Sequence, residues 1–166
     1  CKLLEHVVHS NIMSHLDKCD VLDNAQHGFR KRRSCATQLI STLDEFADCL
    51  NKREQIDAIL LDFSKAFDKV DQEGLLMKLE HLDIRHSLHS WCESFLVGRS
   101  QKVLVDGMAS DPKPVLSGVP QGTVLGPLFF LVYINDISGG LSKGTKLNLF
   151  ADDSCLYRAI KSVGDT

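Results

Sequence analysis

Apolar residues recur at the spacing of a helix face in five stretches of the chain. The first stretch predicts a helix over residues 2–17, and the second predicts a helix that begins after Ser34, a residue type that caps helices. The apolar stripe of that second helix is Ala36, Leu39, Ile40, Leu43, Phe46, Ala47 and Leu50. A third helix is expected after Asp71, a fourth is expected to end at Gly98, and a fifth, strongly apolar one covers about residues 125–137.

Shorter apolar runs predict strands. The run from Ile56 to Phe63 is typical of a buried strand, and an acid, Asp62, lies near its end. Residues 146–150 and 154–160 predict two strands joined by Ala151-Asp152-Asp153.

A further pair of strands is expected at residues 103–105 and 115–116, around a turn that contains Asp106-Gly107. The strands do not alternate strictly with helices, which favours the α+β class over a parallel α/β fold. The sequence therefore predicts an antiparallel sheet with helices packed on one face.

Composition and charge narrow the functional classes. The chain has 166 residues, 43% of them hydrophobic, and a formal net charge of −3, which fits one globular domain and excludes a strongly basic nucleic-acid coat. No apolar run approaches the roughly 18 residues of a membrane helix. The six cysteines include no C-x-x-C pair, and the histidines lack partners for a tetrahedral site, so reduced thiols in an intracellular protein are expected rather than zinc.

The beginning of the chain indicates a piece of a longer protein. The first residue is Cys1 rather than Met, and it falls inside the amphipathic pattern of the first predicted helix. We therefore expect a fragment of a larger polypeptide.

Three carboxylates carry the strongest chemical signal. Asp152 and Asp153 are adjacent between apolar strands, where they repel one another and where a hard divalent cation would relieve the repulsion. Asp62 ends an apolar run, where a charge needs a partner or a metal. On neighbouring strands the three would resemble a two-metal phosphoryl-transfer centre. The alternatives are a solvated acidic turn for the pair and, for Asp62, a cap of the turn or helix that follows.

Two loops are candidates for binding phosphates or nucleotides. The segment Ser117-Gly118-Val119-Pro120-Gln121-Gly122-Thr123 has glycines that allow a close backbone approach and a glutamine that can donate and accept hydrogen bonds. The run Arg30-Lys31-Arg32-Arg33 can neutralise phosphates. An ordinary loop before a helix and a solvated basic turn are the alternatives.

Taken in order, these elements resemble the reverse transcriptases of non-long-terminal-repeat (LINE-type) retrotransposons. The matching segments are Gln26-His27-Gly28-Phe29-Arg30, Leu61-Asp62-Phe63-Ser64-Lys65-Ala66-Phe67-Asp68-Lys69-Val70-Asp71, Gly118-Val119-Pro120-Gln121-Gly122-Thr123-Val124-Leu125-Gly126-Pro127, Tyr133-Ile134-Asn135-Asp136-Ile137 and Phe150-Ala151-Asp152-Asp153. The resemblance covers nearly the whole chain.

The resemblance implies the fingers and palm of a right-hand polymerase that copies RNA into DNA. Residues 1–55 would be part of the fingers and residues 56–166 the palm, without a thumb. Asp62, Asp152 and Asp153 would be catalytic and would bind two Mg²⁺ ions, with Mn²⁺ as an alternative, together with the backbone carbonyl of Phe63.

The same resemblance implies the substrate contacts. Ala66 and Phe67 would abut the sugar, where the Phe67 ring leaves no room for a 2′-hydroxyl; ordinary core packing is the alternative for Phe67. Gln121 and Gly122 would lie against the incoming nucleotide and the template base, and Arg30 near the nucleotide or template path. Lys65 and Asp68 are interpreted as surface or local ion-pair positions.

The implied partners are an RNA template, a DNA primer and deoxynucleoside triphosphates, in the nucleus or cytoplasm, with no membrane and no secretion. The rest of the parent polyprotein, with a thumb and in many relatives an endonuclease, would be a further partner. Two other hypotheses stay open: a non-catalytic remnant that at most binds nucleic acid or another chain, and a different palm-like metal enzyme such as a nucleotide cyclase.

Overall fold

The structure is a computed structural model that describes residues 2–161; Cys1 and the last five residues of the predicted palm lie outside it. The chain folds into two units, each built from two segments. Unit 1 comprises Cys1–Val21 and Lys65–Tyr133, and unit 2 comprises Leu22–Ser64 and Ile134–Thr166. The units thus interleave along the chain, and the predicted boundary after residue 55 stays a prediction. The assignment of fingers and palm stays a prediction.

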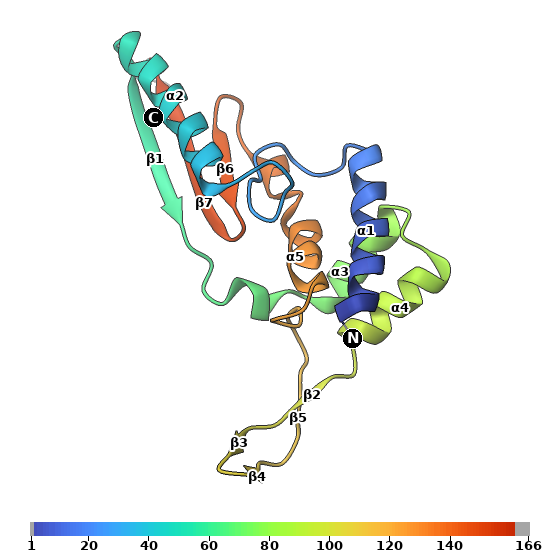
Figure 1. Cartoon of the computed structure of the whole chain (residues 1–166). Helices are drawn as coiled ribbons and strands as arrows, with labels where there is room; N and C mark the ends of the chain where they lie inside the picture. Colours follow the sequence, from blue (N-terminus) through green and yellow to red (C-terminus); the bar gives the residue numbers. More distant parts are fainter. Residues whose placement is uncertain (1, 162–166) are drawn as a thin grey trace. The chain divides into compact units, whose positions relative to one another are not determined.

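Unit 1 is mainly helical, and its helices form where the apolar spacing predicts them (Figure 1). They are α1 (Lys2–Lys18), the short 3₁₀ helix η1 (Ala66–Lys69), α3 (Gln72–His81), α4 (His86–Leu96) and α5 (Leu125–Ile134). Asp71 caps α3 as expected, because its carboxylate accepts a hydrogen bond of 2.9 Å from the Gly74 backbone N–H.

Apolar side chains from several of these helices form the core of unit 1. Among the fully buried ones are Ile12, Leu16, Leu75, Leu79, Leu96, Leu125, Leu128 and Phe129. The Phe129 ring on α5 meets the edge of Phe95 on α4 at a centroid distance of 6.0 Å. Although α5 is strongly apolar, it ends at Ile134, before the expected residue 137. No helix among residues 2–161 has both the length and the apolarity to cross a membrane.

The hairpin region of unit 1 differs from the sequence prediction. Residues Leu104–Val105 (β3) pair with Met108–Ala109 (β4), which follow directly, and not with residues 115–116. The cause is the turn between them, because Asp106 and Gly107 both have positive φ angles, of 49° and 80°. Such a two-residue turn returns the chain at once, so the partner strand is the next segment. A second pair of short strands, Ser100–Gln101 (β2) with Lys113–Pro114 (β5), flanks the β3–β4 hairpin on both sides in the sequence.

Unit 2 contains an antiparallel sheet of three strands with a helix on one face (Figure 1). The strands are β1 (Gln55–Leu61), β6 (Lys146–Phe150) and β7 (Asp153–Ile160), in the order β1-β7-β6. The helix is α2 (Cys35–Asn51), and the short 3₁₀ helix η2 (Ile137–Gly140) precedes the hairpin. Ser34 caps α2 in a capping box with Thr37, which confirms the predicted start.

The burial expected for the strand over residues 56–63 is wrong. The strand β1 is exposed along most of its length, and Leu60 keeps 81% of its accessible surface; β1 is also an edge strand with only β7 beside it. On α2 the predicted stripe is also largely exposed, and Thr42 is the one residue of this helix that is buried. The exposed members of that stripe are Leu39, Ile40, Leu43 and Leu50.

A polar and aromatic network joins α2 to the sheet. The Tyr157 ring on β7 meets Phe46 edge-on at 5.2 Å, and its hydroxyl donates to the Glu45 carboxylate at 2.5 Å. Lys146 donates to the same carboxylate at 2.8 Å. Burial raises the pKa of Glu45, but the hydrogen bonds and charge of these partners outweigh it, so the net effect is a lowered pKa. Burial and the Glu45 carboxylate raise the pKa of Tyr157.

This network predicts an acid-sensitive contribution to stability. Because the pKa of folded Glu45 lies below its ordinary value of 4.5, the ionised carboxylate stabilises the fold above that pH, and the stabilisation is lost as the pH falls through the lower, folded-state pKa. We expect Glu45→Gln to lower the free energy of unfolding at neutral pH. The difference from the wild type should shrink in acid.

Urea unfolding at pH 7 and at pH 3.5 measures this difference. Asp44→Asn, which neutralises an exposed neighbour on the same helix, serves as the control and should change stability little at either pH. A Glu45→Gln difference that stays constant between the two pH values would contradict the assignment.

Candidate active site

The register of the sheet in unit 2 brings the three predicted catalytic acids to one end. Leu61 on β1 is paired with Ser154 on β7. Asp62 directly follows Leu61 and Asp153 directly precedes Ser154, so both acids lie just beyond the last β1–β7 pair, at the same end of the sheet. This end of the sheet is called the carboxylate edge below. Asp152 lies in the two-residue turn that joins β6 to β7, also at this edge. Asp62 and Asp153 are exposed and Asp152 is half-buried, so solvent and ligands can reach them.

The donor chemistry of this edge suits a hard divalent cation, although the side chains do not form a closed cage. Among residues 2–161, no three His, Cys, Asp or Glu side chains are grouped closely enough to bind a metal by themselves. Mg²⁺ in phosphoryl-transfer sites is commonly bound by one or two carboxylates, with waters and substrate phosphates as the other ligands. The carboxylates of Asp62, Asp152 and Asp153 fit that role, and Phe63 directly follows Asp62.

The segment that contains Arg30 packs beside the same hairpin. Gln26 forms a parallel bridge with Leu149 on β6, where the His27 N–H donates to the Leu149 carbonyl at 2.9 Å and the Leu149 N–H donates to the Ala25 carbonyl at 2.9 Å. Burial lowers the pKa of His27 most, and the positive charges of Arg33 and then Arg30 lower it further. Because residues 25–27 are hydrogen-bonded to Leu149, this loop continues the sheet beside β6 and is not an independent basic turn.

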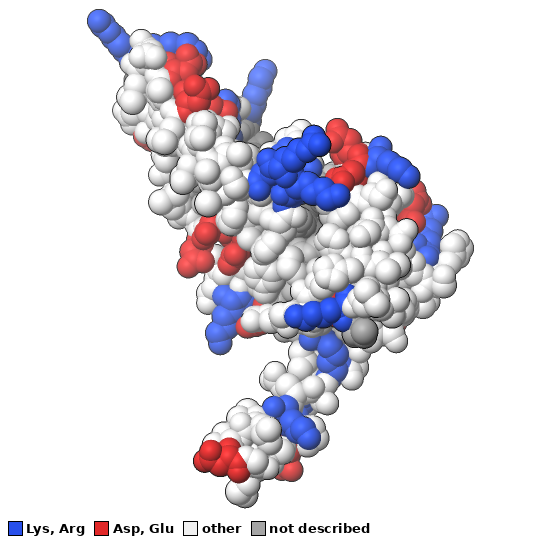
Figure 2. All heavy atoms as spheres, in the orientation of Figure 1, with Lys and Arg blue, Asp and Glu red and all other residues white. Residues whose placement is uncertain are grey.

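The basic run itself is partly used inside the loop. Arg30 donates to the backbone carbonyls of Leu22 and Asp23, both at 3.2 Å, and Arg33 donates to those of Asn24 and Gln26. Lys31 and Arg32 are exposed, and Figure 2 shows Lys and Arg side chains gathered over the loop between α1 and α2. Two of the four cations thus stabilise the loop. A contact of Arg30 with nucleotide or template stays a prediction.

The predicted substrate-binding residues of unit 1 form a second group. Phe67, Gln121 and Gly122 line one cavity of about 380 Å³, together with Pro120, Thr123, Gly126 and Pro127. One face of the Phe67 ring stacks on Phe130, with a centroid distance of 4.1 Å and an interplanar angle of 18°. Ala66, the first residue of η1, is half-buried beside it in sequence. Phe67 is therefore both a packing residue and a wall of the cavity.

The loop of residues 117–122 is attached to η1 through Asp68 and its neighbours. The Gly118 N–H donates to the Val70 carbonyl at 2.7 Å, and the Ser117 hydroxyl donates to the Asp68 carbonyl at 2.8 Å. The Gln121 amide donates to the Asp68 carboxylate at 2.7 Å. Gly118 has a φ of 82°, and a Cβ there would lie 2.7 Å from the Asp68 carbonyl oxygen.

Sequence reasoning missed this role of Asp68. The residue was interpreted as a surface or local ion-pair position, whereas its carboxylate orients Gln121, which is 53 residues further along the chain. The one signal that the sequence offered was the position of Asp68 next to Phe67, in the segment 61–71 that resembles reverse transcriptases. A contact over that sequence distance cannot be read from local pattern.

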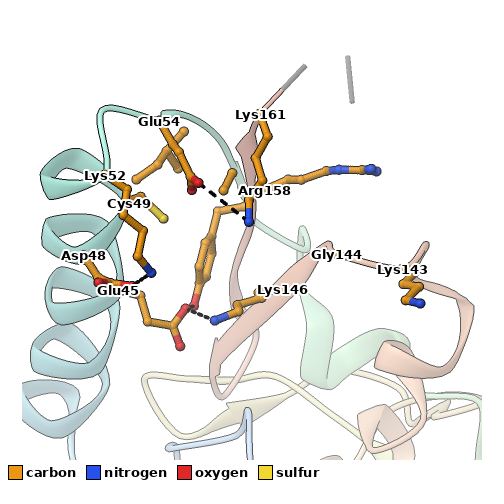
Figure 3. A pocket seen from close by; sticks show the side chains of 13 residues that line it. Glu45, Asp48, Cys49, Lys52, Glu54, Lys143, Gly144, Lys146, Arg158 and Lys161 are labelled. Carbon is orange, nitrogen blue, oxygen red and sulfur yellow. Dashed lines mark hydrogen bonds and ion pairs between the residues drawn. The ribbon is translucent and has the colours of Figure 1, made fainter. Parts of the chain in front are cut away.

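A further pocket in unit 2, of about 440 Å³, lies between α2 and the end of the sheet remote from Asp152 (Figure 3). Its charged side chains largely pair with one another: Lys52 with Asp48 at 2.5 Å, Lys146 with Glu45 at 2.8 Å and Lys161 with Glu54 at 3.6 Å. Because these acids neutralise the lysines beside them, the pocket is a weaker candidate for phosphate binding than the carboxylate edge is for a cation.

The close approach at Gly118 predicts a large cost for a single methyl group. Gly118→Ala must accept an unfavourable positive φ and a clash with the Asp68 backbone, whereas Gly107→Ala has a similar φ of 80° but no neighbour within 4 Å. We expect Gly107→Ala to lower the free energy of unfolding by about 1 kcal/mol, and Gly118→Ala to lower it by several times as much. Urea unfolding of the two variants measures the difference, and equal losses would refute the packing described for the loop.

The chain is similar to known polymerases over nearly its whole length. Residues 1–163 match the family model described as "Reverse transcriptase (RNA-dependent DNA polymerase)". The chain is 29% identical over 168 residues to the "RNA-directed DNA polymerase from mobile element jockey" of Drosophila melanogaster, and 32% identical over 158 residues to the jockey polymerase of Drosophila funebris. These matches cover 98% and 92% of this chain but only 18% and 17% of the relatives.

Solved structures agree on the fold. The apo telomerase from Candida tropicalis, truncated from its C-terminal domain, matches 94% of this chain and 34% of its own, with a TM-score of 0.70 and 14% sequence identity. The expected α+β polymerase fold is thus confirmed, as is the resemblance to the polymerases of mobile elements. With the match extending over nearly every residue, this chain belongs to the reverse transcriptase family.

Proposed function

We propose that this chain is the catalytic core of an RNA-directed DNA polymerase, which transfers deoxynucleotides to a primer 3′-hydroxyl in a two-metal reaction and acts in retrotransposition. The sheet register supports this proposal most directly, because it brings Asp62, Asp152 and Asp153 to one edge in a member of the reverse transcriptase family. The chain spans less than a fifth of the length of the jockey relatives.

The carboxylates would bind two Mg²⁺ ions, or Mn²⁺ in their place, with the Phe63 carbonyl as a further oxygen ligand. When bound, the ions would lower the pKa of the primer 3′-hydroxyl and stabilise the charge of the leaving pyrophosphate. The chain then needs no nucleophile of its own. Its contribution is to fix the acids on paired strands, where the geometry costs little reorganisation.

The unit 1 cavity would receive the nucleotide. The Phe67 ring, fixed by its stack on Phe130, would contact the sugar together with Ala66 and exclude a 2′-hydroxyl. Gln121, oriented by Asp68, and Gly122 would lie against the nucleotide and the template base.

The proposed partners follow from this reaction. They are an RNA template, a DNA primer, deoxynucleoside triphosphates and the remaining parts of the parent polyprotein, including a thumb. Arg30 would lie near the nucleotide or the template path, and the exposed Lys31 and Arg32 offer charge for phosphates. The site of action would be the nucleus or cytoplasm.

Primer extension on an RNA template with Mg²⁺ tests the catalytic acids. The protein used is this chain extended at its C-terminus with the segment that follows the match in the jockey polymerase. Asp152→Asn should reduce nucleotide incorporation by about a thousand-fold, because it removes several kcal/mol of metal-mediated stabilisation.

Asp57→Asn is the matched control, since Asp57 is an exposed acid of the same sheet, on β1, where it pairs with Arg158 of β7 away from the acidic turn. It should leave incorporation nearly unchanged. Equal incorporation by the wild type and Asp152→Asn would refute the catalytic assignment and favour a remnant that only binds nucleic acid.

Sugar selectivity tests the cavity separately. Phe67→Val should raise the incorporation of ribonucleotides relative to deoxynucleotides by about 10- to 100-fold, the range expected when a pocket wall is removed. Phe95→Val, the same change at a half-buried phenylalanine of unit 1 that does not line the cavity, serves as the control. If both variants relax selectivity equally, or neither does, Phe67 does not act as a steric gate.

A further inference from the structure

The side chain of Gln26 is buried against the turn that contains Asp152. Its Oε1 accepts hydrogen bonds from the Ala151 N–H at 2.9 Å and from the Gly28 N–H at 2.8 Å. Its Nε2 donates to the Ala151 carbonyl at 3.1 Å. Gln26 exposes only 4% of its surface, so water competes little for these bonds. One amide group thus binds both backbone groups of the residue before Asp152.

The turn requires such support because of its backbone conformation. Ala151 has a φ of 55°, in the left-handed region that residues with a Cβ rarely adopt. The Ala151 carbonyl belongs to the same peptide plane as the Asp152 N–H, so the bond from Gln26 fixes the orientation of that plane. The direction in which the Asp152 side chain leaves the turn depends on the same plane.

Gln26 is itself held in place from two sides. Its backbone bridges to Leu149 on β6, and its carbonyl accepts a hydrogen bond of 2.9 Å from Arg33. Gly28 leaves no free space beside the turn, since a Cβ at that position would lie 2.3 Å from the Ala151 nitrogen. The three hydrogen bonds of the Gln26 amide, called the clamp below, therefore have little room to shift.

The chemistry of the clamp demands a primary amide. The site presents two N–H donors and one carbonyl acceptor, and only a side chain that both accepts and donates can satisfy all three. An ionised glutamate offers no donor for the Ala151 carbonyl, and methionine offers neither group. Glutamine matches the site in length and in polarity.

We propose that Gln26 is a positioning residue of the active site, which sets the direction of the Asp152 carboxylate by clamping the Ala151–Asp152 peptide. This inference rests on the proposed function, because it assigns Gln26 to the metal-binding edge. It gives a role to the contact between the Gln26 side chain and the acidic turn, which more than a hundred residues separate in the chain.

Amide hydrogen exchange on this chain, measured by NMR, tests the clamp without any metal. Gln26→Met keeps the side-chain length and removes all three hydrogen bonds. Exchange of the Ala151 and Gly28 amides should accelerate by about ten-fold or more, while the β1–β7 ladder amides keep their wild-type rates. Gln55→Met, at the remote end of the same sheet, should leave Ala151 unchanged. Unchanged Ala151 exchange in Gln26→Met, or equal acceleration throughout the sheet, would overturn the clamp.

Binding of Mn²⁺ alone, followed by electron paramagnetic resonance, tests the link to Asp152. Gln26→Met should weaken Mn²⁺ binding by about ten-fold, the range expected for an outer residue that orients a ligand. If Asp152→Asn weakens Mn²⁺ binding and a folded Gln26→Met does not, the positioning role is wrong. If Asp152→Asn itself has no effect, the proposed metal site fails, whereas the exchange result still stands for the clamp.

Gly28→Ala keeps the test decisive if Gln26→Met does not fold. This variant displaces the Ala151 nitrogen by steric contact and retains the Gln26 amide, so it should accelerate Ala151 exchange and weaken Mn²⁺ binding in the same way. Gly139→Ala, whose added Cβ would meet nothing within 4 Å, is the matched control and should change neither quantity. Identical behaviour of the two alanine variants would overturn the proposal.

Discussion

The antiparallel pairing of β1 with β7 is the constraint on which unit 2 depends. It joins the segment that ends at Leu61 to the segment that begins at Asp153, and its register decides which side chains meet at the sheet edge. Side chains alternate between the two faces of a sheet. A shift of one residue in the β1–β7 register would therefore exchange the face on which the Asp62 side chain lies relative to β7. The two-residue turn between β6 and β7 depends on the same register, since Phe150 pairs directly with Asp153. The chemistry proposed for the acids thus follows from backbone hydrogen bonds.

Both candidate groups of residues are supported by backbone contacts from a distant segment. In unit 2 the Gln26 amide holds the Ala151 turn, and in unit 1 the loop at Gly118 is fastened to η1 beside Asp68. In each case a glycine permits the approach, because a Cβ at Gly28 or Gly118 would lie within 2.7 Å of the neighbouring backbone. Reactive side chains on turns gain their precision from such neighbours, since a turn alone is free to move.

The exposed apolar surface of β1 and α2 belongs to the energetics of unit 2 as well. Leu60 keeps 81% and Ile40 keeps 67% of their accessible surface, so these positions add little to the free energy of folding of unit 2. Its stability relies more on the strand ladder and on the Glu45, Tyr157 and Lys146 contacts between helix and sheet. Unit 2 completely buries Leu149 on β6, but most of the large side chains that are completely buried, such as Phe129, lie in unit 1.

Local pattern in the sequence predicted the five helices, the caps at Ser34 and Asp71, and the β6–β7 hairpin, because helix and hairpin signals arise from residues a few positions apart. It also identified the acids and the Gln121 loop as chemical candidates. Tertiary structure alone decided that β1 is an exposed edge, that the turn at Asp106 closes a shorter hairpin, and that the units interleave along the chain. It likewise revealed the roles of long-range partners such as Gln26. The physical reason is that burial and hydrogen-bond partners are properties of surfaces brought together by folding, whereas periodicity records only which face of an element is apolar.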